Sequence, residues 1–305
     1  MSKVYVFTDY GGPENQQLID RPAPMPGPGE VAIEVRAAGV NPADWKIREG
    51  HLGRHWSLPA TMGREAAGVV TQVGDGVEDF AVGDEVLGLV APGQGGMAEH
   101  TLLRASTTVA KPEEISFTDA ATIPVAAATA YDATHQFELE PGQRLLILGA
   151  GGGVGLMAAQ IGRVHQFTVI GVASQSKRKI VECTGATFVP SGEGAADRVR
   201  EVAPEGVDLI VDLVGGEALG EVAGLVTDPA RIISAADATT ATELGGAALE
   251  RTEEAMEKIT EVIEYGLVDP HVTACYPLAE AGRAIAEVEA GHATGKIVIE
   301  PTPVC

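Results

Sequence analysis

A glycine-rich turn between an apolar run and a run of small residues constrains the fold of this chain more than any other feature. It lies in the segment RLLILGAGGGVGLMAAQIG, which begins at Arg144. Ala150, Gly152 and Gly155 give the A-x-G-x-x-G variant of the dinucleotide-binding fingerprint. In such a turn the backbone amides of Gly152 and Gly153 approach a pyrophosphate, and Gly155 lets the helix pack closely on the strand. The helix N-terminus adds unpaired N–H groups that favour an anion. A glycine turn that only joins a strand to a helix is the alternative.

Strands and helices alternate around this turn, which favours cofactor binding over a simple connection. Such alternation predicts parallel strands with crossover helices, the pattern of a doubly wound sheet. The predicted strands are residues 144–148, 168–173, 208–213 and 231–234, and the predicted helices are 154–164, 177–184 and 250–265.

The two ends of the chain differ from this middle region and resemble each other. Short β-type runs at 31–35, 68–73 and 85–90 are separated by glycine- and proline-rich turns, which suggests a small bent sheet. The tail is predicted as strand 271–276, helix 278–290 and strand 296–300. The sequence therefore predicts an α/β protein in which a Rossmann domain, residues 118–266, is inserted into one β-rich domain, residues 1–117 and 267–305.

The end of the second strand of the Rossmann domain indicates which dinucleotide binds. NAD enzymes place an Asp or Glu there to bind the ribose 2′-hydroxyl. Here the strand is followed by SQSKRK, which has no carboxylate and brings Ser174, Ser176, Lys177 and Arg178 together. A solvated helix start is the alternative, although cations are unfavourable at that end of a helix. The run predicts a 2′-phosphate, and therefore NADPH.

Charge and composition exclude several classes of partner. The net charge of −22 argues against nucleic acid and anionic membrane, because phosphates would be repelled. No apolar stretch is long enough to span a bilayer, and the N-terminus reads as a strand rather than a signal peptide, so a cytoplasmic location is expected.

The three cysteines, Cys183, Cys275 and Cys305, have no metal-like spacing, and Cys183 is expected to be a small packing residue.

Segments along nearly the whole chain resemble the medium-chain dehydrogenase/reductase superfamily, and in particular its zinc-free quinone oxidoreductase branch, the zeta-crystallin-like proteins. The resemblance implies a GroES-like catalytic domain made from both ends of the chain, NADPH in the cleft between the domains, and a dimer formed through Rossmann-domain edges. It is carried by GVNPADWKIREG (39–50), MGREAAGVV (62–70), VGDEVLG (82–88), AATAYDAT (127–134), LGAGGGVG (148–155), VDLIVDLVGGEAL (207–219) and GHATGKIVI (291–299).

Two positions separate the chain from the zinc-dependent relatives. Asn41 stands where those enzymes have a cysteine, and Arg64 stands where they have a histidine. The four-cysteine structural zinc loop also has no counterpart between residues 91 and 110. A tetrahedral zinc site needs three or four thiolate or imidazole ligands, and none of the three cysteines lies in residues 1–117, so no bound metal is expected.

The resemblance also assigns cofactor contacts by position. It implies Asn41 and Thr129 near the nicotinamide, Gly152, Gly153, Val154 and Gly155 at the pyrophosphate, and Ser174 with Lys177 at the 2′-phosphate.

The active-site proton donor of many quinone reductases is missing. Leu52 stands in place of their tyrosine, and a second tyrosine, near the adenosine phosphate, has no counterpart around Gly192. His51 is a candidate donor, because a histidine titrates near neutral pH; an exposed loop histidine without a catalytic role is the alternative.

The loop around His51 is expected to border the substrate. It holds a cluster formed by Trp45, Arg48, His51, His55 and Trp56.

Arg64 and Glu65 could be an acid–base pair, but an ion pair that braces the sheet is the preferred interpretation.

Three functions remain open from the sequence. The first is metal-free, NADPH-dependent hydride transfer to a quinone, for which positioning of donor and acceptor supplies most of the rate. The second is reduction of an alkene conjugated to a carbonyl, since Leu52 and Trp56, which would select the acceptor, do not decide between the two. The third is an NADPH-binding protein without catalysis, which the lost tyrosine keeps open.

Overall fold

The computed structural model describes residues 1–291 and 293–301, and its chain divides into two compact units. The barrel unit combines Met1–Ala126 with Val272–Cys305, and the Rossmann unit is Ala127–His271. Cys305 lies outside the described residues. No helix among the described residues is long and apolar enough to cross a membrane. The insertion of an α/β unit into a β-rich unit confirms the predicted fold class.

The barrel unit is built on a sheet whose strands run in the order β14-β15-β3-β5-β6-β7. Because β3 also pairs with β7, strands β3, β5, β6 and β7 close into a ring. A smaller sheet has the order β2-β1-β4. The strands are β1 (Ser2–Phe7), β2 (Gln16–Arg21), β3 (Glu30–Val40), β4 (Ala60–Thr61), β5 (Glu65–Val73), β6 (Glu85–Val90), β7 (His100–Ala110), β14 (Val272–Pro277) and β15 (Lys296–Glu300).

Alternation along β3 shows why these residues form a barrel strand. Val31, Ile33 and Val35 are buried in the main core of this unit, as a strand with one face inside requires. At Gly68 a Cβ would lie 2.1 Å from the Glu34 carbonyl oxygen, so β5 approaches β3 closely only because this residue is glycine.

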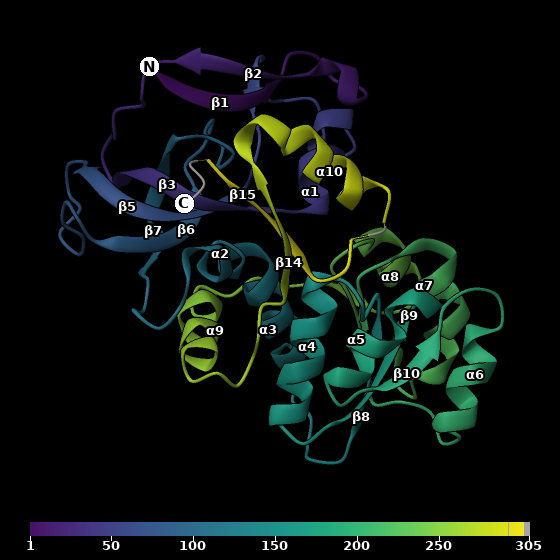
Figure 1. Cartoon of the computed structure of the whole chain (residues 1–305). Coiled ribbons are helices and arrows are strands. Elements are labelled where there is room, and N and C mark those ends of the chain that lie inside the picture. Colours follow the sequence, from purple (N-terminus) through teal and green to yellow (C-terminus); the bar gives the residue numbers. More distant parts are fainter. Residues whose placement is uncertain (292, 302–305) are drawn as a thin grey trace. The chain divides into compact units, whose positions relative to one another are not determined.

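Two helices of the barrel unit are linked by a partly buried ion pair. α1 (Pro42–Glu49) begins at Asn41 with proline in its first position and ends at Gly50, whose φ of 83° is left-handed. α10 (Ala281–Glu289) lies beside it (Figure 1). The fully buried Arg48 of α1 donates from Nη2 to Oε1 of Glu289 at 2.9 Å. A short helix, α2 (Phe117–Ala120), packs against β3 and β5.

The Rossmann unit has a parallel sheet in the order β10-β9-β8-β11-β12-β13. This is the 3-2-1-4-5-6 order of a doubly wound dinucleotide-binding sheet, with β8 as its first strand. The strands are β8 (Arg144–Leu148), β9 (Thr168–Ala173), β10 (Thr187–Pro190), β11 (Leu209–Asp212), β12 (Ile232–Ser234) and β13 (Ala247–Ala248).

Helices cover this sheet on both faces, as the buried strand residues require. One core joins Leu146, Leu148 and Ile170 to side chains of α6, α7 and α8. Their neighbours Leu145 and Ile147, which point to the other face, are also fully buried. The helices are α3 (Ala128–His135), α4 (Gly153–Val164), α5 (Arg178–Cys183), α6 (Ala195–Val202), α7 (Gly216–Val222), α8 (Ala238–Glu243) and α9 (Ala255–Glu264).

Most predicted elements are confirmed, and one helix is shorter than its sequence pattern. The helix predicted at 250–265 begins only at Ala255. Before it, the backbone N and Oγ1 of Thr252 both donate to Oδ1 of Asp132, at 3.3 and 2.6 Å. This side-chain contact holds the preceding residues outside the helix, an interaction that periodicity cannot reveal.

Candidate cofactor-binding and active site

The glycine turn after β8 has the close backbone packing that the fingerprint predicts. Gly149 has a φ of 83°, a left-handed conformation that glycine adopts without strain. A Cβ on Gly155 would lie 2.4 Å from the Gly149 carbonyl oxygen and 2.6 Å from Cα of Ala150. α4 begins at Gly153, directly after this turn, so its first N–H groups lie at the carboxyl end of β8. This geometry suits the phosphates of a dinucleotide.

Lys177 lies directly over this turn. A Cβ on Gly151 would be 2.5 Å from Cδ of Lys177, so the lysine side chain occupies the space above that glycine. Burial of its side chain lowers the pKa of Lys177. Ser174 and Ser176, which follow β9, share a hydrogen bond of 3.1 Å between their hydroxyl oxygens. These three side chains therefore lie at the same end of neighbouring strands β8 and β9.

Arg178, predicted beside Lys177, is engaged elsewhere. Its guanidinium pairs with Glu182 at 3.2 Å and stacks over the ring of Phe188 at 4.9 Å. Lys177 is therefore the basic residue of this run that packs on the glycine turn.

Carboxylates shape the neighbouring turns at the same end of the sheet. The buried Asp212 at the end of β11 accepts hydrogen bonds from the amides of Val214 and Gly215 and from the Ser234 hydroxyl. Asp237, after β12, accepts from the Gly216 amide. Sequence reasoning missed these residues, although an aspartate at the end of a buried strand is a signal that could have found Asp212.

The two residues expected near the nicotinamide belong to different units. Thr129 lies on α3 of the Rossmann unit and is 5% exposed. Asn41 lies at the start of α1 in the barrel unit and is 4% exposed.

Asn41 belongs to a buried cluster that we call the Lys296 cluster, formed by Asn41, Asp44, Glu65 and Lys296. The ammonium of Lys296 donates to Oδ1 of Asn41 at 2.7 Å, to the Val40 carbonyl at 3.0 Å and to Oε1 of Glu65 at 3.3 Å. Nδ2 of Asn41 donates to the same Glu65 oxygen at 2.7 Å. Lys296 was not predicted, because it lies 255 residues from Asn41 in the sequence.

The predicted brace between Arg64 and Glu65 is wrong. Glu65 is fully buried and pairs with Lys296, while its second carboxylate oxygen accepts from the Val125 amide at 2.7 Å. Arg64 is exposed. Adjacent residues at the start of a strand point to opposite faces, so the two side chains do not meet.

Asp44 is the unusual member of the cluster. Its Oδ2 accepts from the backbone N of Asn41 at 2.8 Å, which closes the first turn of α1. Its Oδ1 is buried and has no hydrogen-bond partner among the described residues. Burial, and to a smaller extent the nearby charge of Glu65, raises the pKa of Asp44 to about 7, against the opposing effects of the Asn41 hydrogen bond, Lys296 and Arg64.

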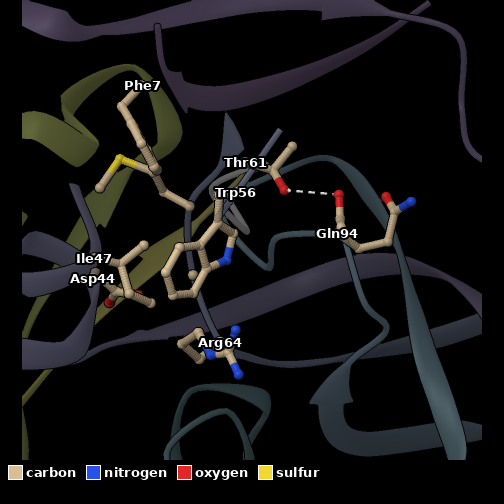
Figure 2. Close-up of a pocket in the computed structure, with 10 residues that line it drawn as sticks. Phe7, Asp44, Ile47, Trp56, Thr61, Arg64 and Gln94 are labelled. Atoms are coloured by element: carbon tan, nitrogen blue, oxygen red, sulfur yellow. Dashed lines mark hydrogen bonds between the residues drawn. The ribbon is translucent and has the colours of Figure 1, made fainter. Parts of the chain in front are cut away.

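Asp44 also lines a pocket of the barrel unit (Figure 2). This pocket encloses about 330 Å³, including solvent at its mouth. Its polar side chains include Asp44, Thr61, Arg64 and Gln94, and the Trp56 indole forms an apolar wall. The amide of Trp56 donates to the Tyr10 hydroxyl at 2.9 Å, which holds the indole-bearing loop against the unit.

Of the five loop residues predicted to border the substrate, Trp56 lines this pocket. His55 stacks on the Trp56 ring, and His51 is largely exposed, with Nε2 2.9 Å from Oε2 of Glu49. The expectation that Arg48 borders the substrate is wrong, because its side chain is fully buried and its guanidinium pairs with Glu289. Trp45 packs partly buried against the core.

The residues present do not fit a zinc ion. The ammonium of Lys296 already supplies the positive charge that Glu65 and Asn41 face, and the cluster contains no thiolate or imidazole. Within residues 1–291 and 293–301, no group of three or more His, Cys, Asp or Glu side chains could hold a metal ion.

The expectation for Cys183 is wrong as well. It lies on α5 as predicted, but its side chain is exposed rather than packed, because α5 turns Val181 towards the sheet instead.

Two family models match the chain. The model described as "Alcohol dehydrogenase GroES-like domain" matches residues 27–113, and the model described as "Zinc-binding dehydrogenase" matches residues 184–299.

Known proteins match over almost the whole chain. The quinone oxidoreductase of Rattus norvegicus is 33% identical over 97% of this chain and 96% of its own length. The synaptic vesicle membrane protein VAT-1 homolog of the same species is 31% identical over 98% of this chain and 84% of its own length.

Solved structures agree with the fold described above. The quinone oxidoreductase from Coxiella burnetii superposes with a TM-score of 0.90 at 27% identity, over 99% of both chains. The Escherichia coli quinone oxidoreductase complexed with NADPH gives a TM-score of 0.89 at 25% identity, over 98% of this chain and all of the other. The parallel sheet, the barrel and these full-length matches lead to one conclusion: the chain belongs to the quinone oxidoreductase branch of the medium-chain dehydrogenase/reductase superfamily and is an oxidoreductase.

Proposed function

We propose that this enzyme is a metal-free, NADPH-dependent oxidoreductase that transfers a hydride to a quinone. The observation that carries the choice of cofactor is the position of Lys177 over the glycine turn, at the end of a strand that no carboxylate follows. A carboxylate there would repel a 2′-phosphate, whereas an ammonium attracts it. The E. coli relative described as a complex with NADPH supports the same choice.

The residues that would hold NADPH lie on the turns described above. The first amides of α4 would bind the pyrophosphate, and Lys177 with the two serines would bind the 2′-phosphate. Arg178 contributes less, because Glu182 and Phe188 compete for its guanidinium. The proposed contacts are Asn41, Thr129, Gly152, Gly153, Val154, Gly155, Ser174, Ser176, Lys177 and Arg178.

NADPH supplies the hydride, and the chain positions the acceptor to receive it. The Trp56 indole offers a flat apolar wall for an aromatic ring, and the Arg64 guanidinium offers hydrogen bonds to an acceptor oxygen. Reduction of a quinone needs no proton donor from the protein, since the reduced anion is protonated by solvent. Positioning of the two reactants then accounts for most of the rate enhancement.

Reduction of an alkene conjugated to a carbonyl is the second candidate. The unpartnered carboxyl oxygen of Asp44 at the pocket favours it, because this reaction needs a proton as well as a hydride.

Binding of the two cofactors tests the proposal. Charge-assisted hydrogen bonds are worth about 1.5–3 kcal/mol each, and partial solvent exposure leaves about 2–4 kcal/mol for the site. NADPH should therefore bind about 30- to 1,000-fold more tightly than NADH. Lys177→Ala should remove most of this preference by weakening NADPH alone, and the double variant with Arg178→Ala should remove little more. Lys179→Ala, an exposed neighbour in the same run, is the matched control.

Fluorescence titration at low and high salt measures these affinities, and oxidation of NADPH by 9,10-phenanthrenequinone measures turnover. The preference should shrink as salt screens the phosphate contact. Equal binding of NADH and NADPH by the wild type would refute the cofactor assignment, and absence of NADPH oxidation by quinones would refute the acceptor assignment.

The family resemblance also leads us to propose a homodimer in the cytoplasm that acts on a small-molecule acceptor. Light scattering at micromolar concentration tests the assembly; a monomer mass would contradict it.

A further inference from the structure

We propose that Asp44 donates the proton when this enzyme reduces an alkene conjugated to a carbonyl, a role that Leu52 cannot fill. This inference rests on the proposed hydride transfer from NADPH and identifies the residue that would complete the reaction. Asp44 lines the pocket of the barrel unit, next to Asn41, the residue proposed to approach the nicotinamide.

The two oxygens of the Asp44 carboxyl have different surroundings. Oδ2 is fixed by the amide of Asn41, so the side chain has one orientation. Oδ1 is buried and has no hydrogen-bond partner among the described residues. A buried polar atom without a partner destabilises the folded state, so a purely structural capping residue would be expected to satisfy both oxygens. A proton on Oδ1 that is passed to a bound substrate explains why that oxygen is left unpaired.

The charges around Asp44 favour its protonated form near neutral pH. β15 presents Lys296, and the start of β5 presents Glu65 and Arg64. The Lys296 ammonium donates to Val40, Asn41 and Glu65, and none of its hydrogen bonds among the described residues goes to Asp44. α10 presents Glu289, which binds Arg48 at the other end of α1. Burial is the dominant effect and places the pKa near 7, where a general acid is most effective.

The other ionisable groups near the pocket are less suited to donate. His51 is exposed, shares a hydrogen bond with Glu49, and is not among the residues that line the pocket. Arg64 lines the pocket, but a guanidinium is not a proton donor in acid catalysis. Asp44 therefore combines access to the pocket with a releasable proton.

The proposed step balances without a further reactant. The alkene accepts a hydride at its β-carbon from NADPH, which leaves as NADP⁺, and the π electrons move to the carbonyl oxygen to give an enolate. The O–H bond at Oδ1 of Asp44 then breaks and its proton bonds to the α-carbon, directly or through one water, which restores the ketone. The Asp44 carboxylate, left negative, regains a proton from solvent before the next turnover.

Asp44→Asn tests this inference, because an amide oxygen can still accept from the Asn41 backbone while the amide group cannot act as an acid. With saturating NADPH and an enone at pH 6, the variant should lose about 100-fold in kcat. Turnover of 9,10-phenanthrenequinone should fall far less, by no more than about tenfold, since solvent protonates that product. Asp79→Asn, the same change on an exposed loop, should alter neither rate.

The pH dependence of kcat on the enone distinguishes a proton donor at Asp44 from a residue with only a structural role. Wild-type kcat on the enone should fall as the pH rises through about 7, and this break should vanish in Asp44→Asn. Carbon NMR of protein labelled at aspartate Cγ should show one carboxyl that titrates near pH 7 in the wild type and is missing in the variant.

Several results would overturn the inference. A pH break that persists in Asp44→Asn, or equal losses on enone and quinone, would assign Asp44 a structural role. A wild type that reduces quinones but no enone would leave the acid without a substrate and also refute the inference. If neither a quinone nor an enone supports NADPH oxidation by the wild type, the proposed function is refuted instead. The carbon NMR titration then still reports on Asp44 independently.

Discussion

Replacing Asp44 by asparagine should change how the stability of the protein depends on pH. The carboxyl ionises near its ordinary pKa of 3.8 in the unfolded chain but at about 7 in the folded protein. The folded state therefore favours the protonated form, and the contribution of Asp44 to stability is full below pH 3.8 and is lost as the pH rises through 7. Asparagine does not ionise, so the variant escapes this loss.

The size of the effect follows from the two pKa values. At 1.36 kcal/mol per pKa unit, ionisation of Asp44 costs the folded state about 4 kcal/mol at alkaline pH. About 2 kcal/mol of this falls between pH 5.5 and 8.5. This range stays clear of the more acidic conditions that would bring a chain of net charge −22 towards neutrality and aggregation.

Urea unfolding of the wild type and Asp44→Asn at intervals across this range measures the difference in unfolding free energy. We expect the variant to gain about 2 kcal/mol relative to the wild type from pH 5.5 to 8.5. Asp79→Asn should show no such trend, because its side chain is exposed. A difference that does not depend on pH would refute the reasoning. Such a constant difference is expected if Asp44 is ionised in the folded protein throughout this range, as it would be if Lys296 held its pKa low.

Three further predictions concern the metal, the alternative donor and the partly buried ion pair. The purified protein should contain no stoichiometric zinc by metal analysis and should keep its activity in EDTA; one zinc per chain would contradict this. His51→Ala should lower kcat on enones by less than about threefold, whereas a loss of about 100-fold would return the donor role to His51. Glu289→Gln should destabilise the protein by about 2 kcal/mol in urea, because it removes the charge that faces the fully buried Arg48 guanidinium; this figure is discounted for the partial exposure of Glu289. An unfolding free energy equal to that of the wild type would show that Glu49 and the Gly11 carbonyl suffice for Arg48.

The Rossmann unit could be predicted because its signals are local. The glycine turn, the strand before it and the helix after it are contiguous, and each follows from backbone freedom and apolar periodicity within about twenty residues. The strands at Arg144–Leu148 and Thr168–Ala173 accordingly have the predicted bounds. The absence of a carboxylate after the second of them is also a local observation, and it supports NADPH together with the position of Lys177.

The contacts that individual side chains make could not be predicted in the same way. Lys177 and Arg178 are neighbours with the same charge, yet one packs on Gly151 and the other pairs with Glu182. Cys183 was expected inside and is exposed. These differences depend on which face of a short helix meets the sheet, and neighbouring side chains on a helix point about 100° apart.

The fold class, the family and the place of the dinucleotide turn therefore follow from the sequence alone. Which ionisable groups meet inside the barrel unit depends instead on how its strands pair. Lys296 reaches Asn41 across 255 residues and Glu65 across 231, because β15 pairs with β3, which in turn pairs with β5. That contact pairs the Lys296 ammonium with Glu65, whereas among the described residues Asp44 has no hydrogen bond to a cation. The acidity of a buried carboxyl depends on desolvation and on charges within a few ångströms, and strand pairing brings those charges together from distant parts of the chain.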